Sequence, residues 1–182
     1  TKTVYFVYSG EVMLYNLTKH GNRKVIFILG KGRLLNQSIV SKKPNALFCE
    51  AVCPVKVIEI AEEQFLQLME QSHALTRAVL REYERNLWRM GHQLKNTTGN
   101  MQMERKIAAK LWKLGRDFGV DTEDGVMIDI DLTITLMADL VGAPRENVSR
   151  ACKVLTDRGL IRYGNKRFTL TDSDGLADFY KM

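Results

Sequence analysis

Cysteine is scarce in this sequence, and long apolar runs are absent. The three cysteines, Cys49, Cys53 and Cys152, are too sparse for a metal site. They are typical of a reduced protein with buried thiols, although redox sensing by Cys49 and Cys53 stays open. The sequence has no run of about 18 apolar residues and no signal peptide, so we expect a cytoplasmic protein without a membrane segment.

Catalytic side-chain sets are lacking as well. His20, His73 and His92 are scattered, and no Ser/His/Asp, Cys/His or paired-carboxylate arrangement stands out. The glycines at positions 30 and 32 lack the third glycine and the following helix of a dinucleotide site. We therefore predict that the protein is not an enzyme and has no metal and no certain cofactor.

The positive charge of the chain is concentrated in one segment. The whole chain has 27 Lys and Arg residues against 21 Asp and Glu residues, which gives a formal net charge of +6. Residues 133–170 contain seven cations and three anions, so this fifth of the chain accounts for 7 − 3 = +4. Such an excess suits a polyanionic partner such as double-stranded DNA, although it is compatible with many other functions.

Two kinds of hydrophobic pattern divide the chain. The first sixty residues contain short apolar runs separated by turns, which indicates a small antiparallel barrel or jelly roll. Helical spacing begins at residue 61, and a turn-rich joint follows at residues 95–100. The prediction is an α+β protein with a sensing roll (1–71, its N-terminal part missing), a dimerisation helix with hinge (72–98) and a DNA-binding domain (99–182).

The long helix expected at residues 72–95 carries a stripe with heptad spacing. Its apolar positions step by 3, 4, 3 and 4 residues. They are Leu80, Tyr83, Leu87, Met90 and Leu94. Such a seam is typical of two paired helices, so we predict a homodimer. The alternative is a helix that packs on its own roll.

Residues 133–157 have the pattern of a helix-turn-helix. Thr133 can cap the first helix, Gly142 can end it with a positive φ, and Pro144 fits the first turn of the second helix. Ala138 is small where the two helices must cross. The second helix is expected to bury Val148, Ala151, Val154 and Leu155.

Removing the buried stripe leaves the side chains that would face DNA. They are Arg145, Glu146, Ser149, Arg150 and Lys153. Arginine can donate two hydrogen bonds to guanine, glutamate can accept from cytosine, and serine can do either.

Residues 160–170 resemble a two-stranded wing with a turn at Gly164 and Asn165, and Lys166 and Arg167 at its tip are expected to meet phosphates. Thr133 completes the predicted DNA-binding set. The alternative is a solvated helix-turn-helix inside an unrelated domain.

The order of roll, long helix, joint and winged helix, together with the RENVSR sequence at residues 145–150, resembles the Crp/Fnr superfamily of bacterial transcription regulators. The resemblance covers essentially the whole chain and implies a cyclic-nucleotide-binding-like β-roll. It also implies that Glu146 and Arg150 read the G·C pair of a TGA core. Ser149 resembles the Fnr-type helix, which prefers TTGAT-like half-sites.

The effector region departs from the cyclic-nucleotide pattern. Where cyclic AMP binders have Gly-Glu, this chain has Asn36 and Gln37, and Asn45, Ala46 and Leu47 replace the Arg-Ser/Thr-Ala run. Without the arginine, a cyclic phosphate would be buried against no partner. We therefore expect no binding of cyclic AMP. The neutral cassette of Asn36, Gln37, Asn45, Leu47 and Phe48 is closer to the halorespiration-type regulators, which bind small aromatic acids, and indicates a small, largely apolar effector.

The resulting prediction is a homodimeric transcription regulator that binds a palindromic TTGAT-like site under effector control, with RNA polymerase as a further partner. Effector binding would shift the packing of the long helices and bring the DNA-binding domains into register. The alternative is a ligand- or redox-sensing protein that signals through protein contacts.

Overall fold

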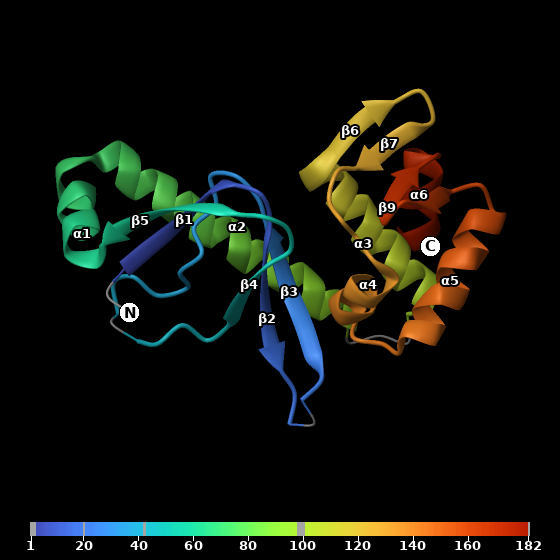
Figure 1. Ribbon diagram of the computed structural model, residues 1–182, viewed down its shortest axis with the longest axis horizontal. Coiled ribbons are helices and arrows are strands. Elements are labelled where there is room, and N and C mark those ends of the chain that lie inside the picture. The colour runs from blue at the N-terminus through green and yellow to red at the C-terminus, as the bar shows by residue number, and fades with distance from the viewer. Residues whose placement is uncertain (1–2, 20, 42, 98–100, 182) are drawn as a thin grey trace. The chain divides into compact units, whose positions relative to one another are not determined.

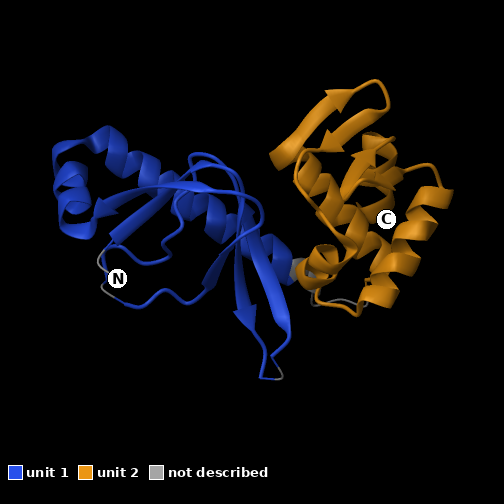
Figure 2. Cartoon of the chain, in the orientation of Figure 1, with its two compact units in different colours: residues 1–95 blue, residues 96–182 orange. Residues whose placement is uncertain are grey.

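The computed structural model describes residues 3–19, 21–41, 43–97 and 101–181, with side chains described outside 95–97. It divides into two compact units, Thr1–Lys95 and Asn96–Met182 (Figure 2). The first unit combines strands with two helices, and the second contains helices around a small sheet (Figure 1). The predicted α+β class is confirmed. No helix in the described part of the chain is long and apolar enough to cross a membrane.

The strands of the first unit form two small antiparallel sheets, one of order β1-β5 and one of order β3-β2-β4. These strands are β1 (Thr3–Ser9), β2 (Val12–Leu17), β3 (Arg23–Leu29), β4 (Phe48–Ala51) and β5 (Lys56–Ala61). Each lies where the apolar runs of the sequence predict a strand. The alternation of side chains along β2 and β3 sends one face of this pair into a buried cluster.

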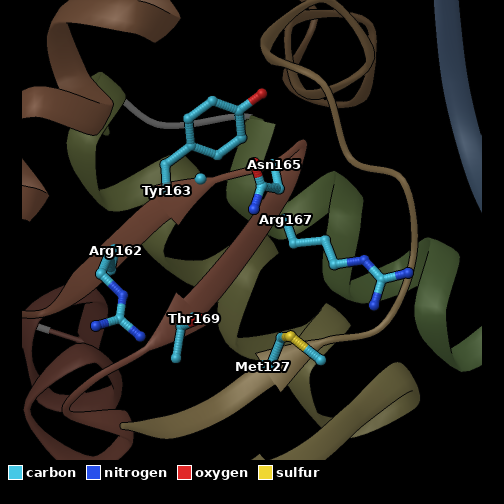
Figure 3. Close-up of a pocket in the computed structure, with 7 residues that line it drawn as sticks. Met127, Arg162, Tyr163, Asn165, Arg167 and Thr169 are labelled. Carbon is cyan, nitrogen blue, oxygen red and sulfur yellow. The ribbon is translucent and has the colours of Figure 1, made fainter.

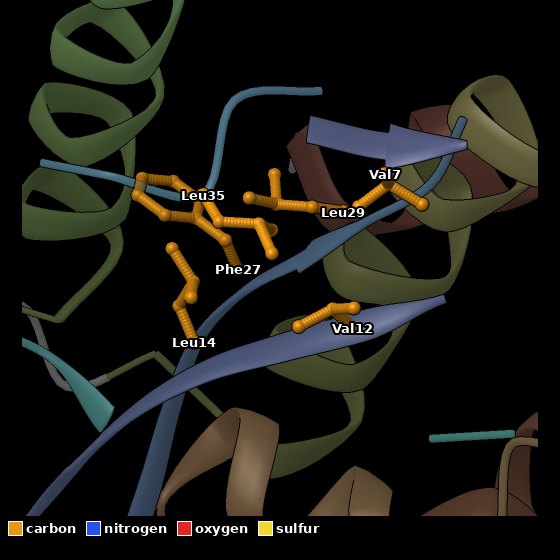
Figure 4. Packing of buried hydrophobic residues seen from close by; sticks show 6 residues of the cluster. All are labelled: Val7, Val12, Leu14, Phe27, Leu29 and Leu35. Carbon is orange, nitrogen blue, oxygen red and sulfur yellow. The ribbon is translucent and has the colours of Figure 1, made fainter. Parts of the chain in front are cut away.

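That buried cluster is the first half of the unit's core (Figure 4). It contains Val7, Val12, Leu14, Phe27, Leu29 and Leu35. A second cluster joins the roll to the helices, with Val4, Leu34 and Ile39 from the roll, Phe65 from the first helix and Val79 from the second. The apolar side chains of the roll are therefore covered partly by its own strands and partly by the helices that follow.

Two helices end the first unit: α1 (Glu62–Gln71) and α2 (His73–Thr97). Helix α2 extends through Lys95, Asn96 and Thr97, where the sequence indicates a joint, so the predicted start of the hinge at residue 95 is wrong. The rest of that joint, residues 98–100, lies outside the described residues.

Helix α2 has one face that packs on the roll and one that is exposed, and pairing of the exposed face with a second helix stays a prediction. Val79 is buried in the core, and Tyr83 is half-buried against the same cluster. Leu80, Leu87 and Leu94 are exposed on the other side. Tyr83, three positions after Leu80, is rotated towards the roll, and its place in the dimer interface stays a prediction.

The second unit begins with α3 (Met103–Phe118), whose buried stripe includes Ile107, Leu111 and Leu114. Its other elements are β6 (Gly119–Thr122), β7 (Gly125–Ile128), α4 (Ile134–Val141), α5 (Arg145–Asp157), β8 (Ile161–Gly164), β9 (Arg167–Leu170) and α6 (Ser173–Lys181). The predicted two-stranded wing is part of a four-stranded antiparallel sheet of order β6-β7-β9-β8. Strand β6 and helix α6 were not expected from the sequence.

Candidate nucleic-acid interface and effector site

The first helix of the predicted helix-turn-helix, α4, begins and ends as its sequence indicates. The Thr133 hydroxyl accepts a hydrogen bond from the Leu136 amide at 3.0 Å, which satisfies one free N–H of the first turn. Gly142 has φ +71° and donates to the Ala138 carbonyl at 2.8 Å. Thr133 is thereby engaged as a helix cap, and its predicted role in DNA binding stays a prediction.

The second helix, α5, starts one residue later than expected. Pro144 has φ −57° and ψ 141°, so it precedes the helix instead of lying in its first turn, and this expectation is wrong. Its carbonyl accepts hydrogen bonds from the Asn147 and Val148 amides at 3.1 and 3.2 Å. The ring still fixes the backbone just before Arg145, which orients the N-terminal turn of α5.

The buried face of α5 is formed by Val148, Ala151, Cys152 and Leu155. Val154 is 38% exposed, so its predicted burial is wrong, and Cys152 takes that place in the stripe. Burial raises the pKa of the Cys152 thiol to about 11, so this cysteine behaves as a small apolar residue. The stripe packs α5 against α3 and α4 and leaves the opposite face open.

The open face of α5 carries all five side chains predicted to face DNA. These exposed residues are Arg145, Glu146, Ser149, Arg150 and Lys153. Their spacing of one, three or four residues places them on one side of the helix. Donors for guanine and acceptors for cytosine therefore lie side by side on a surface that a major groove can accommodate.

Arg150 is held along the helix by two hydrogen bonds. Its guanidinium donates to Asn147 Oδ1 at 3.0 Å, and its Nε donates to the Glu146 carbonyl at 3.4 Å. Asn147 was not among the predicted site residues. Its position three residues before Arg150 was the available signal, because such pairs are neighbours on a helix surface.

The wing turns at Asn165 and Lys166, with φ values of 50° and 59°, one residue later than predicted. Both angles are typical of the tight hairpin turns that connect twisted strands. Lys166 is therefore at the tip. Arg167 is not directed at the tip: its guanidinium forms an ion pair with Asp129 at 2.5 Å. An aspartate therefore already pairs with Arg167, and its expected contact with phosphate stays a prediction.

A shallow hollow of about 480 Å³ lies on the outer face of the wing sheet (Figure 3). Met127, Thr169, Arg162 and Arg167 are among its lining residues. Arg162 forms an ion pair with Asp124, whose pKa it lowers by hydrogen bonding and by its charge. The arginines of this face are therefore balanced by aspartates, in contrast to the cations on α5.

In the effector cassette, Asn36 is a structural residue. Its side chain is 8% exposed, accepts a hydrogen bond from the Tyr5 amide at 2.8 Å and donates to the Thr3 carbonyl at 2.9 Å. The side chain therefore fastens the loop to β1 as a strand neighbour would. Its oxygen and its amide nitrogen are both bound to the backbone, and its predicted place in an effector pocket stays a prediction.

The remaining cassette residues also bind one another. Asn45 Oδ1 accepts from the Gln37 amide at 2.8 Å, and Gln37 Oε1 accepts from the Leu47 amide at 3.1 Å. Leu47 packs against the roll core, whereas Phe48 is exposed and stacks on Tyr15 with centroids 5.5 Å apart. The cassette is thus closed by its own hydrogen bonds, and the contribution of these four residues to a pocket stays a prediction.

The polar side chains that face the roll come from α2. Glu82 forms an ion pair with Arg33 at 2.6 Å, and the Arg89 guanidinium lies 5.3 Å from the centre of the Phe27 ring. Arg89 is only 8% exposed, and the buried Asn86 Oδ1 has no hydrogen-bond partner among the described residues. Sequence reasoning missed this polar set because it followed only the apolar stripe of the helix.

The cysteines do not meet the requirements of a reactive pair. Cys49 is exposed, which corrects the expectation of buried thiols, but partial burial of its sulfur environment raises the pKa of this thiol. Cys53 donates a hydrogen bond to Glu11 Oε2 at 2.9 Å. The described residues contain no cluster of three or more metal-ligating side chains.

Comparison with known proteins identifies both units. Residues 1–72 match the family model of the cyclic nucleotide-binding domain, and residues 105–179 match the Crp-like helix-turn-helix domain. Neither match establishes a ligand, because a family model reports a fold and its ancestry.

Curated relatives match nearly the whole of this chain and about three quarters of their own length. A CRP-like cAMP-activated global transcriptional regulator of Mycobacterium tuberculosis is 25% identical over 175 residues, which is 96% of this chain and 78% of the relative. A global nitrogen regulator of Nostoc sp. is 25% identical over 170 residues, covering 92% and 76% of the two chains.

The fold is shared with a solved structure of a CooA mutant from Carboxydothermus hydrogenoformans. The TM-score is 0.82 at 18% sequence identity, over 98% of this chain and 78% of that chain. The order of the two domains, the exposed face of α5 and these similarities all indicate the same family. The chain therefore belongs to the Crp/Fnr family of DNA-binding transcription regulators.

Proposed function

We propose that this regulator binds a palindromic, TTGAT-like DNA site as a homodimer and responds to an effector other than cyclic AMP. The observation that carries the proposal is the exposed face of α5, where Glu146, Ser149 and Arg150 lie together outside the buried stripe. The N-terminal half of the second helix is where base contacts fall in helix-turn-helix proteins. A two-fold dimer would present this face to two half-sites about one helical turn, ~34 Å, apart.

Each side chain on α5 has a chemical role in this proposal. Arg150 would keep its bond to Asn147 Oδ1 and donate its remaining N–H groups to guanine O6 and N7, while Glu146 would accept from cytosine N4. Lys153 and, at the wing tip, Lys166 would contact phosphates and add affinity for any sequence. RNA polymerase is the further partner that a transcription regulator of this kind would engage.

The effector proposal rests on the charge of the cassette. Gln37 and Asn45 are neutral, and both are bound to backbone amides of their own loop. A cyclic phosphate placed there would lose its water without gaining a cation from these positions, which costs several kcal/mol. A small, largely apolar effector fits the neighbouring surface of Leu47 and Phe48 better. Its binding would act by favouring one of two arrangements of α2.

The test of DNA binding is fluorescence anisotropy with a labelled TTGAT palindrome and a scrambled duplex at several salt concentrations. We expect tighter binding to the palindrome and a linear fall of log K with log salt, because phosphate contacts release counterions. Equal affinity for both duplexes would contradict sequence-specific reading. Absence of salt-dependent binding to either would instead favour the second candidate, a sensor that acts through protein contacts.

Calorimetry tests the effector proposal separately. Cyclic AMP at millimolar concentration should give no heat of binding, whereas a small aromatic acid should bind and raise the unfolding temperature. Tight binding of cyclic AMP would overturn this part of the proposal and leave the DNA-binding part unaffected.

A further inference from the structure

The exposed face of α2 contains a glycine that nothing in its own unit explains. A Cβ atom built on Gly91 meets no atom within 4 Å outside the neighbouring helix backbone. Glycine in the middle of a helix is unfavourable relative to alanine, because it loses more conformational freedom on folding. No close approach within the described chain compensates for this at position 91.

Gly91 lies in line with the exposed leucines. Leu80, Leu87 and Leu94 are 56%, 73% and 64% exposed and recur every seven residues. Glu84 and Gly91 lie between them, which gives steps of 4, 3, 4 and 3 along one side of the helix. The opposite side of α2 packs on the roll through Val79 and Arg89. Tyr83 is half-buried against the roll, whereas Met90 is 46% exposed beside the leucines, so Glu84 and Gly91 extend the predicted seam on its outer side.

We propose that Gly91 is the point of closest approach between the α2 helices of two copies of this chain. The inference rests on the proposed homodimer. In a parallel pair about a two-fold axis, each seam residue faces its own copy, so Gly91 meets Gly91 of the partner subunit. The distance between two packed helices depends on the side chains at the contact, and two glycines allow the backbones to come nearest.

A second copy fits this face better than an unrelated helix does. Leucines at a seven-residue repeat match an identical helix in register, so that each leucine packs beside its own counterpart. Glu84 is exposed between Leu80 and Leu87 and would face its own charge across the axis. Repulsion there and the absence of a side chain at Gly91 together place the crossing in the C-terminal half of α2.

The proposal makes a prediction opposite to that of an ordinary heptad seam. In an ordinary seam, Gly91→Leu adds an apolar knob and tightens the dimer. At a close crossing, the same leucine separates the helices, and we expect the dimer dissociation constant to rise at least tenfold. Sedimentation equilibrium of the full chain measures both outcomes. A dissociation constant that is unchanged or lower would overturn the proposal.

Glu84→Leu is the matched control, since it introduces the same side chain seven residues earlier on the same stripe. It should lower the dissociation constant several-fold by replacing a repelled carboxylate with an apolar contact. An increase equal to that of Gly91→Leu would show that the seam tolerates no leucine anywhere and would contradict a crossing at Gly91.

Two further results separate the crossing at Gly91 from the open position of this residue and from the homodimer. The Gly91→Leu chain should retain its far-UV helical signal, because the added side chain meets only open space in the unit itself. Loss of helical signal would overturn the claim that this position is open. A wild-type chain that stays monomeric at every concentration would overturn the homodimer and the crossing, whereas a wild-type dimer tightened by Gly91→Leu would overturn the crossing alone.

Discussion

The loop of residues 36–48 and the recognition helix α5 both contain short polar side chains, yet the two regions use them in opposite directions. In the loop, Asn36, Gln37 and Asn45 bind the surrounding backbone. On α5 the helix pairs its own backbone beyond the first turn, so Glu146 and Arg150 are left on its exposed face. A polar side chain is therefore available to a partner only where regular structure has already paired the backbone around it.

The largest effect should come from Asn36→Ala, which tests whether the loop side chains are structural. The change leaves the Tyr5 amide and the Thr3 carbonyl without their partner, at a cost of about 3 kcal/mol in the free energy of unfolding. Urea denaturation measures it. As a control, Asn45→Ala should cost less because Asn45 is exposed. If Asn36→Ala instead left stability unchanged and weakened effector binding, the loop would be a binding site after all.

Arg150→Ala tests whether the exposed side chains of α5 are available to DNA. It should weaken binding to the TTGAT palindrome by about 1–3 kcal/mol and relax discrimination at the contacted guanine, with little change in stability. Anisotropy titrations on the palindrome and on a duplex with that base pair exchanged provide the measurement. Lys166→Ala is the control, because loss of a phosphate contact should weaken all sequences alike. Equal losses on specific and random DNA for Arg150→Ala would exclude base reading.

Asn147→Ala should have a smaller effect, because Asn147 acts on DNA only through Arg150. Removing its 3.0 Å bond frees the guanidinium and adds side-chain entropy that DNA binding must then overcome, about 0.5–1 kcal/mol. The loss should appear on the specific palindrome and vanish in the Arg150→Ala background. An equal loss in both backgrounds would indicate that Asn147 contacts DNA directly.

The smallest effect concerns the balanced charges of the wing sheet. Arg162 lowers the pKa of Asp124 below its ordinary value of 3.8. A lowered pKa in the folded state stabilises the fold above the ordinary value, and this contribution is lost as pH falls through the folded-state value. NMR titration should therefore find the Asp124 midpoint below 3.8 and returning towards it in Arg162→Ala. An unchanged midpoint would show that water screens the pair completely.

Particular residues show how far sequence reasoning reached. Gly142 and Thr133 define the ends of α4 by local backbone chemistry, and five of the predicted α5 residues are exposed because helical periodicity alone selects them. The burial of Val154 was wrong because this residue lies at the border of a helix face, where the neighbouring elements decide burial. The ion pair of Arg167 was missed because Asp129 is 38 residues away in the chain.

The sequence by itself determined the element order, the helix-turn-helix and the side chains that α5 exposes, because these depend on contacts within a few residues. Only the tertiary structure decided which polar groups are already in use. It directs Asn36 to the backbone of β1, pairs Arg162 and Arg167 with aspartates, and turns Gly91 instead of Tyr83 to the open face of α2. Long-range pairing and helix rotation depend on residues far apart in the chain, and no local pattern records them.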